Sequence, residues 1–161
     1  MSYPDPKYLG EKGEISATFR PVDTAADVVS GSGSRTHYLA TGAATGGEFG
    51  LYRMDMAPRG GGPRTHFHKS ISESFFVISG TVRLFNGESW IDGTAGDFLY
   101  VPQGGLHAFR NESDDPASML ILFTPGAPRE EYFEKVAEVA TEWSPEDQAE
   151  FYLRHDTFWT A

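Results

Sequence analysis

The stretch GGGPRTHFHKSISESFFVISG, residues 60–80, carries the clearest structural signal in the chain. It begins with glycines and a proline, which favour a loop, and ends in an apolar run that favours a β-strand. Within it, His66 and His68 stand two positions apart. Because side chains at positions i and i+2 of a strand point to the same face, we expect both imidazoles on one side of the chain.

Two further residues extend this pair into a candidate metal site. Glu73 follows His68 at an odd spacing, so it reaches the same side only if the polar sequence Lys-Ser-Ile-Ser at 69–72 turns or bulges. His107 follows a second turn, Pro-Gln-Gly-Gly at 102–105. Imidazole and carboxylate groups are good ligands for divalent transition metals, which makes these residue types in one place a candidate binding site.

Short strand-like runs fill the region from about residue 36 to 125. Asn86-Gly87 is the strongest hairpin signal, because both central residues of a type I′ turn need positive φ. The expected strands are His37–Ala40, Glu48–Met56, Glu73–Ser79, Thr81–Phe85, Ser89–Asp92, Phe98–Val101, His107–Asn111 and Ser118–Thr124. Many short strands without intervening helices predict a sandwich or barrel.

The two ends of the chain differ from this central region. Residues 1–35 are expected to form an N-terminal arm with one edge strand over Glu14–Arg20. Residues 126–161 are expected to form helices packed on the barrel. Pro128 precedes the first helix, and Ser144 begins the second with a pattern close to a capping box.

Composition excludes several functional classes. The chain has 161 residues, a formal net charge of −10 and no cysteine. The charge argues against nucleic-acid or anionic-membrane partners, and the missing cysteines exclude thiol catalysis and disulfide scaffolds. No secretory signal or membrane-spanning run is evident in the sequence, so we expect a soluble, cytoplasmic protein with a small-molecule substrate.

Two spaced patterns resemble the sequence motifs of the cupin superfamily. The first motif, G-x5-H-x-H-x3,4-E-x6-G, is matched by Gly60, His66, His68, Glu73 and Gly80. The second, G-x5-P-x-G-x2-H-x3-N, is matched by Gly96, Pro102, Gly104, His107 and Asn111. All ten specified positions agree, over residues 60–111. The strand pattern extends the resemblance to about residues 36–125.

The resemblance implies an all-β cupin jelly-roll barrel over residues 36–125, with short C-terminal α-helices. It implies one divalent transition metal in the barrel mouth, which in cupins is Fe, Ni, Mn, Co, Cu or Zn. By the same analogy the metal ligands are His66, His68, Glu73 and His107. These four ligands leave one or two positions of a five- or six-coordinate ion open, as a catalytic metal site requires.

Alternation along the strands suggests roles for neighbouring apolar residues. Phe75 and Val77 share the strand face of Glu73, and Phe109 shares that of His107, so we expect these three to line a substrate cavity. Phe76 and Ile78 point to the opposite face. Their apolar character predicts either a second packed layer or a subunit interface, and because cupins often form dimers through this face, a homodimer is expected.

The resemblance narrows the range of possible activities but does not identify a single one. The chain is similar to small single-domain cupins grouped with quercetin dioxygenase, including the segment FTPGAP at 123–128. This implies a dioxygenase acting on a small aromatic or enolic substrate, flavonol- or polyketide-like, with Glu73 also taking the substrate hydroxyl proton. Two alternatives remain: a non-redox metal-dependent cyclase, isomerase or lyase, and a cupin that binds a small ligand without turnover. The complete ligand set favours an enzyme.

Overall fold

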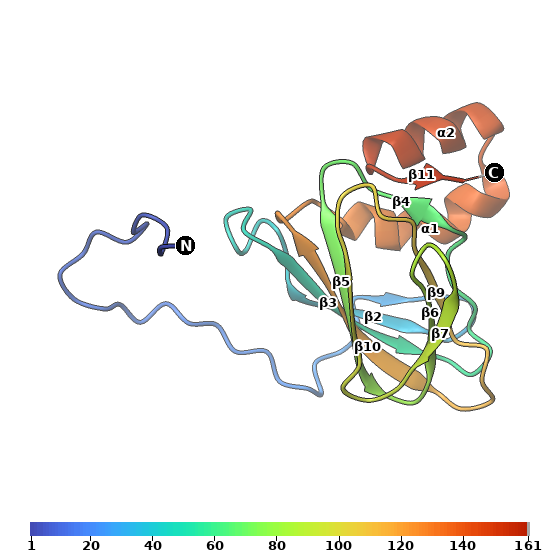
Figure 1. The fold of residues 1–161 in the computed structure, drawn as a ribbon, viewed down its shortest axis with the longest axis horizontal. Helices are drawn as coiled ribbons and strands as arrows, with labels where there is room; N and C mark the ends of the chain where they lie inside the picture. The colour runs from blue at the N-terminus through green and yellow to red at the C-terminus, as the bar shows by residue number, and fades with distance from the viewer. Residues whose placement is uncertain (161) are drawn as a thin grey trace.

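The computed structural model describes residues 1–160 as a β-rich body from which an extended N-terminal arm projects (Figure 1). Its strands are β1 (Val28–Val29), β2 (Arg35–Ala40), β3 (Gly50–Met56), β4 (His66–Phe67), β5 (Ser72–Ser79), β6 (Val82–Phe85), β7 (Trp90–Gly93), β8 (Phe98–Val101), β9 (Ala108–Arg110), β10 (Ala117–Thr124) and β11 (Phe158–Trp159). Its helices are α1 (Glu130–Glu142) and α2 (Pro145–Arg154). Each strand expected between residues 36 and 125 is present, within two residues at either end.

The strands form antiparallel sheets around one apolar core. One sheet has the order β1-β2-β3-β10-β5-β8, a second has the order β7-β6-β9, and β4 pairs with β11. The six-stranded and three-stranded sheets both contribute side chains to the same buried cluster. This arrangement confirms the predicted all-β class and jelly-roll architecture.

Strand β10 shows how alternation in the sequence builds this core. Ala117, Met119, Ile121 and Phe123 are buried, while the residues between them are partly exposed. Ile121 is paired with Tyr52 on one side and with Phe75 on the other. Because side chains of a strand alternate between its two faces, this period of two supplies one layer of the core.

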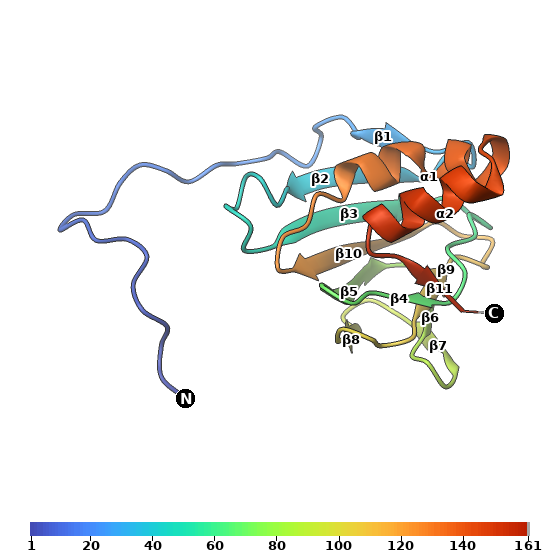
Figure 2. The same cartoon turned by 90° about the horizontal axis from the view of Figure 1, so that it is seen from above.

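The two helices lie together over one end of the β-body (Figures 1 and 2). The hydroxyl of Ser144 accepts a hydrogen bond from the amide of Asp147 at 3.2 Å and caps α2, as its sequence predicted. Phe133 of α1 contacts both the barrel core and the cluster between the helices. The helices thus pack against the β-sheets. No helix within residues 1–160 is long and apolar enough to cross a membrane.

The N-terminal arm corrects one prediction. Glu14–Arg20 form no strand, and the edge strand is instead β1, which pairs with β2. The arm runs away from the sheets (Figure 2), so residues 14–20 have no neighbouring strand to bond with, whatever their β-propensity. Ile15 and Phe19 consequently remain fully or almost fully exposed.

Candidate metal centre

Main-chain pairing holds His66 and His107 side by side. The amide of each donates to the carbonyl oxygen of the other, both at 3.0 Å. His66 also begins β4, where it lies opposite Trp159 of β11. The centroids of the two imidazole rings are consequently 4.2 Å apart.

A turn returns the chain to these histidines before Glu73. The carboxylate of Asp156, just after α2, accepts hydrogen bonds from the amides of Lys69 at 3.1 Å and Ser70 at 2.8 Å. This turn brings Glu73, the second residue of β5, beside His68. The change of direction that the odd spacing required is therefore present, and the C-terminal segment stabilises it.

The structure brings together the four residues His66, His68, Glu73 and His107, called here the His/Glu cluster. One ligand atom from each lies within 4.8 Å of the others. Oε2 of Glu73 is 3.0 Å from Nε2 of His68 and 2.8 Å from Nε2 of His107. None of the four residues is more than 4% exposed. Over residues 1–160 no second group of this kind and compactness is found.

The three imidazoles are oriented by the main chain. Each donates a hydrogen bond from Nδ1 to a carbonyl oxygen, which belongs to Arg64 for His66, to Asp156 for His68 and to Gly105 for His107. A carbonyl oxygen only accepts, so Nδ1 carries the proton in each ring. In the neutral ring the lone pair then lies on Nε2, which in His68 and His107 faces Glu73. Outer hydrogen bonds of this kind fix the tautomer of histidines that bind metals.

Burial and mutual charge shift the proton affinities within the His/Glu cluster. Burial, followed by the charge of His107, lowers the pKa of His66 to about 3. Burial acts to raise the pKa of Glu73, but the charges and hydrogen bonds of His107 and His68 outweigh it and hold that pKa well below its usual value. Burial acts to lower the pKa of His107, but Glu73 outweighs it and raises that pKa. Glu73 is thus ionised, and the donor set of three nitrogens and one carboxylate fits a divalent transition metal.

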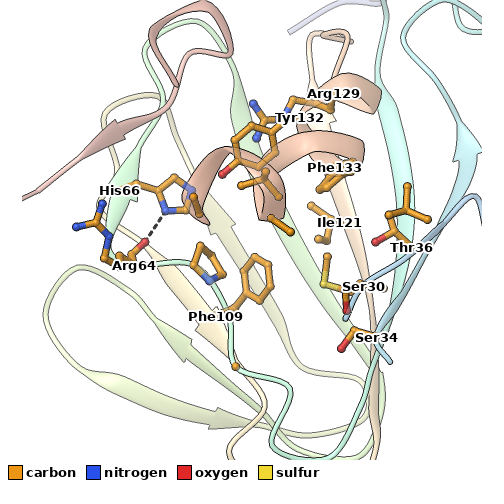
Figure 3. Close-up of a pocket in the computed structure, with 18 of the residues that line it drawn as sticks. Ser30, Ser34, Thr36, Arg64, His66, Phe109, Ile121, Arg129, Tyr132 and Phe133 are labelled. Atoms are coloured by element: carbon orange, nitrogen blue, oxygen red, sulfur yellow. Dashed lines mark hydrogen bonds between the residues drawn. The ribbon is translucent and has the colours of Figure 1, made fainter. Parts of the chain in front are cut away.

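A cavity of about 600 Å³ opens beside the His/Glu cluster (Figure 3). His66 and Glu73 line it, as does Phe109, one of the three expected cavity residues. The other two, Phe75 and Val77, are fully buried in the core and are not among the lining residues. They share the strand face of Glu73 but lie deeper between the sheets.

One wall of the cavity comes from α1 and from Arg129 at its N-cap, which the sequence did not connect to the site. Figure 3 shows the side chains of Arg129, the N-cap of α1, and of Tyr132 in α1 close together at the cavity. Burial raises the pKa of Tyr132 to about 12, so its hydroxyl stays protonated at neutral pH. Asp156 was missed as well, because no motif marks it. One feature of the sequence could have pointed to Arg129. It stands at the start of a predicted helix, where the helix dipole disfavours a cation.

Comparison with known proteins agrees with this geometry. Residues 52–123 match the family model of the Cupin domain, a segment that runs from β3 to β10 and contains the whole His/Glu cluster. Germin-like protein 5-1 from Oryza sativa subsp. japonica is 29% identical over 127 residues, which are 76% of this chain and 52% of the rice protein. The match therefore spans about half the length of that relative.

Two solved structures share the fold. A sugar phosphate isomerase of the cupin superfamily from Silicibacter pomeroyi is 27% identical with a TM-score of 0.51, covering 57% of this chain and 59% of that one. An oxalate oxidase solved in complex with glycolate is 23% identical with a TM-score of 0.56, covering 76% of this chain and 66% of that one.

Proposed function

We propose that this chain, whose residues 52–123 match the family model of the Cupin domain, is a metal-dependent enzyme acting on a small substrate in the cavity beside the His/Glu cluster. More specifically, we propose a dioxygenase that acts on an aromatic or enolic substrate. The main evidence for a bound metal is that three imidazoles, each oriented by a main-chain carbonyl, surround one buried and ionised carboxylate.

His66, His68, Glu73 and His107 would hold the ion beside the cavity. A redox-active divalent ion bound there would supply the electrons for reaction with dioxygen and would lower the pKa of a substrate hydroxyl. Glu73 is the sole carboxylate among the described residues of the cavity wall, and it is the group that would accept this hydroxyl proton. The apolar walls, including Phe109 and Ile121, exclude water from the reacting enolate.

A non-redox cyclase, isomerase or lyase is the second candidate, and Tyr132 is the residue that favours it. Its hydroxyl is protonated, and it lies on the cavity wall together with Glu73. A carboxylate that removes a proton and a hydroxyl that returns one form the pair that isomerisation needs. The likeness to a sugar phosphate isomerase supports this alternative.

The first experiment measures metal per chain by elemental analysis of the purified protein. We expect one divalent transition ion in the wild type and almost none in His66→Ala. His37→Ala is the matched control, because His37 is also buried but bonds to Asp55 outside the cavity. Equal metal in His66→Ala and the wild type would show that the ion is held elsewhere.

The second experiment separates oxidative from non-redox chemistry. Metal-loaded protein is given a flavonol or a catechol in an oxygen electrode, and the same mixtures are followed without oxygen. Oxygen uptake that disappears in Glu73→Gln supports the dioxygenase. Turnover under strict anaerobiosis supports the non-redox enzyme, and tight binding without product supports a binding protein.

A further inference from the structure

Arg129 is a buried cation that has no carboxylate partner. The residue is only 3% exposed. No ion pair among residues 1–160 includes it. Nη1 donates to the carbonyl oxygen of His155 at 2.6 Å, but the buried Nε has no acceptor. Buried charges are normally paired, so the folded chain leaves this guanidinium with an unused charge and an unused donor.

Aromatic rings fix this guanidinium near the His/Glu cluster. Its Cζ lies 4.1 Å from the ring centroid of Tyr132 and 5.0 Å from that of Phe123. Phe123 is in turn paired with Glu73 across β10 and β5. Arg129 also stands at the N-cap of α1, where the helix dipole adds positive potential instead of offsetting the charge.

The cavity is cationic within an acidic protein. Arg64 and Arg129 both line it, although the chain has a net charge of −10. Among its described lining residues Glu73 is the sole acid, and its carboxylate already faces His68 and His107. Much of the remaining wall is apolar and includes Met54, Met56, Ile121, Phe133 and Val136.

We propose that this cavity binds a small organic acid whose carboxylate is held by Arg129 and whose apolar body lies against β3, β10 and α1. The inference rests on the proposed function, because it takes the cavity as the substrate site and places a phenolic or enolic oxygen at the His/Glu cluster. A guanidinium presents planar donors that match a carboxylate, whereas a neutral amide of the same size lacks the charge. Phenolic and enolic acids are therefore the substrate class.

The test compares 3-phenylpropanoate with 3-phenylpropanamide by calorimetric titration of the metal-loaded protein. We expect the wild type to prefer the acid. Arg129→Met should lose about tenfold to hundredfold in affinity for the acid and bind the amide as before, because charge-assisted hydrogen bonds contribute energies of that order. Arg154→Met is the matched control, since this exposed arginine of α2 does not line the cavity, and it should behave as the wild type.

Further variants distinguish a role of Arg129 in ligand binding from effects on folding and on metal binding. Arg129→Lys keeps the positive charge and should recover part of the lost affinity, and thermal denaturation checks that each variant is folded. His66→Ala should lose the metal yet still prefer the acid, so a failure of the metal site leaves the role of Arg129 measurable. A folded, metal-loaded Arg129→Met that binds the acid as tightly as the wild type would overturn the inference. Equal binding of acid and amide by the wild type would do the same.

Discussion

Adjacent residues of β5 lie in opposite environments. Phe75 and Val77 are fully buried between the sheets, whereas Phe76 and Ile78 are 42% and 40% exposed on the outside. Phe98, which pairs with Phe76 on the edge strand β8, is 63% exposed. Antiparallel sheets usually place polar residues on a solvated face. The alternation along β5 therefore predicts on which side of the sheet each side chain lies. It does not predict which side is buried within this chain, because both sides of β5 carry apolar residues.

We propose that a second copy of the chain covers the outer face of β5 and β8. This face joins Phe76 and Ile78 to Phe98 and Tyr100, all of them exposed. The N-terminal arm supplies further unpartnered apolar side chains and projects away from its own body (Figure 2). Groups of exposed apolar side chains are typical of subunit interfaces.

The largest expected difference in stability is between alanine substitutions at the neighbouring residues Phe75 and Phe76. Phe75→Ala removes a fully buried ring and should lower the free energy of unfolding by about 3–5 kcal/mol. Phe76→Ala, measured in dilute monomeric protein, should lower it by less than about 1 kcal/mol, because that ring is already partly hydrated. Urea denaturation measures both. Similar losses for the two variants would contradict the assignment of inner and outer faces.

The outer face should instead control association. Replacing Phe76 and Phe98 together by aspartate places charges in the proposed interface and should weaken the dimer by about a hundredfold or more. Sedimentation velocity measures the change. Ile91→Asp is the control, because Ile91 is similarly exposed but lies on β7 in the other sheet. Wild-type protein that sediments as a monomer at micromolar concentration would refute the homodimer.

A substitution at Asp156 should weaken metal binding, although Asp156 is not one of the four proposed metal ligands. Asp156→Ala removes the carboxylate that holds the amides of Lys69 and Ser70, so Glu73 is positioned less firmly. We expect a loss of about tenfold to hundredfold in metal affinity, as for other outer supports of metal ligands. Competition with a chelator measures this affinity. Asp114→Ala, which removes an exposed carboxylate paired with Arg59, should leave it unchanged.

The smallest expected effect is a shift with pH. Protons and metal compete for the imidazole nitrogens, so affinity should fall as the pH is lowered. Burial acts to lower the pKa of His107, but Glu73 outweighs it and raises that pKa, so protonation of His107 competes at a higher pH than in an unperturbed histidine. His66, with a pKa of about 3, competes only in strong acid. In the metal-free protein, Glu73→Gln removes the charge that raises the pKa of His107, and should move the onset of His107 protonation, followed by NMR, to lower pH. An unchanged onset would show that Glu73 does not set it.

Local patterns were sufficient for the longer strands between residues 36 and 125, and the resemblance to the two cupin motifs was sufficient for the grouping of the His/Glu cluster. Alternating residues and hairpin signals depend on neighbours in sequence, and the ten motif positions fix where both turns fall. Asp156 was not predictable, because its partners Lys69 and Ser70 are distant in sequence and β11 is too short to show alternation. Val77 was placed at the cavity because alternation gives the face of a residue but not its depth.

The C-terminal segment also determines when the His/Glu cluster forms. The carbonyl of Asp156 accepts a hydrogen bond from His68, 88 residues earlier, and β11 pairs with β4 across a similar separation. We expect contacts so distant in sequence to form after the intervening chain has folded, because closing so long a loop costs entropy. We therefore expect the ion to enter a barrel that already exists, and not to act as a folding nucleus. Interactions that form after the folding transition state slow unfolding, so bound metal should lengthen the lifetime of the native protein and leave its refolding rate unchanged.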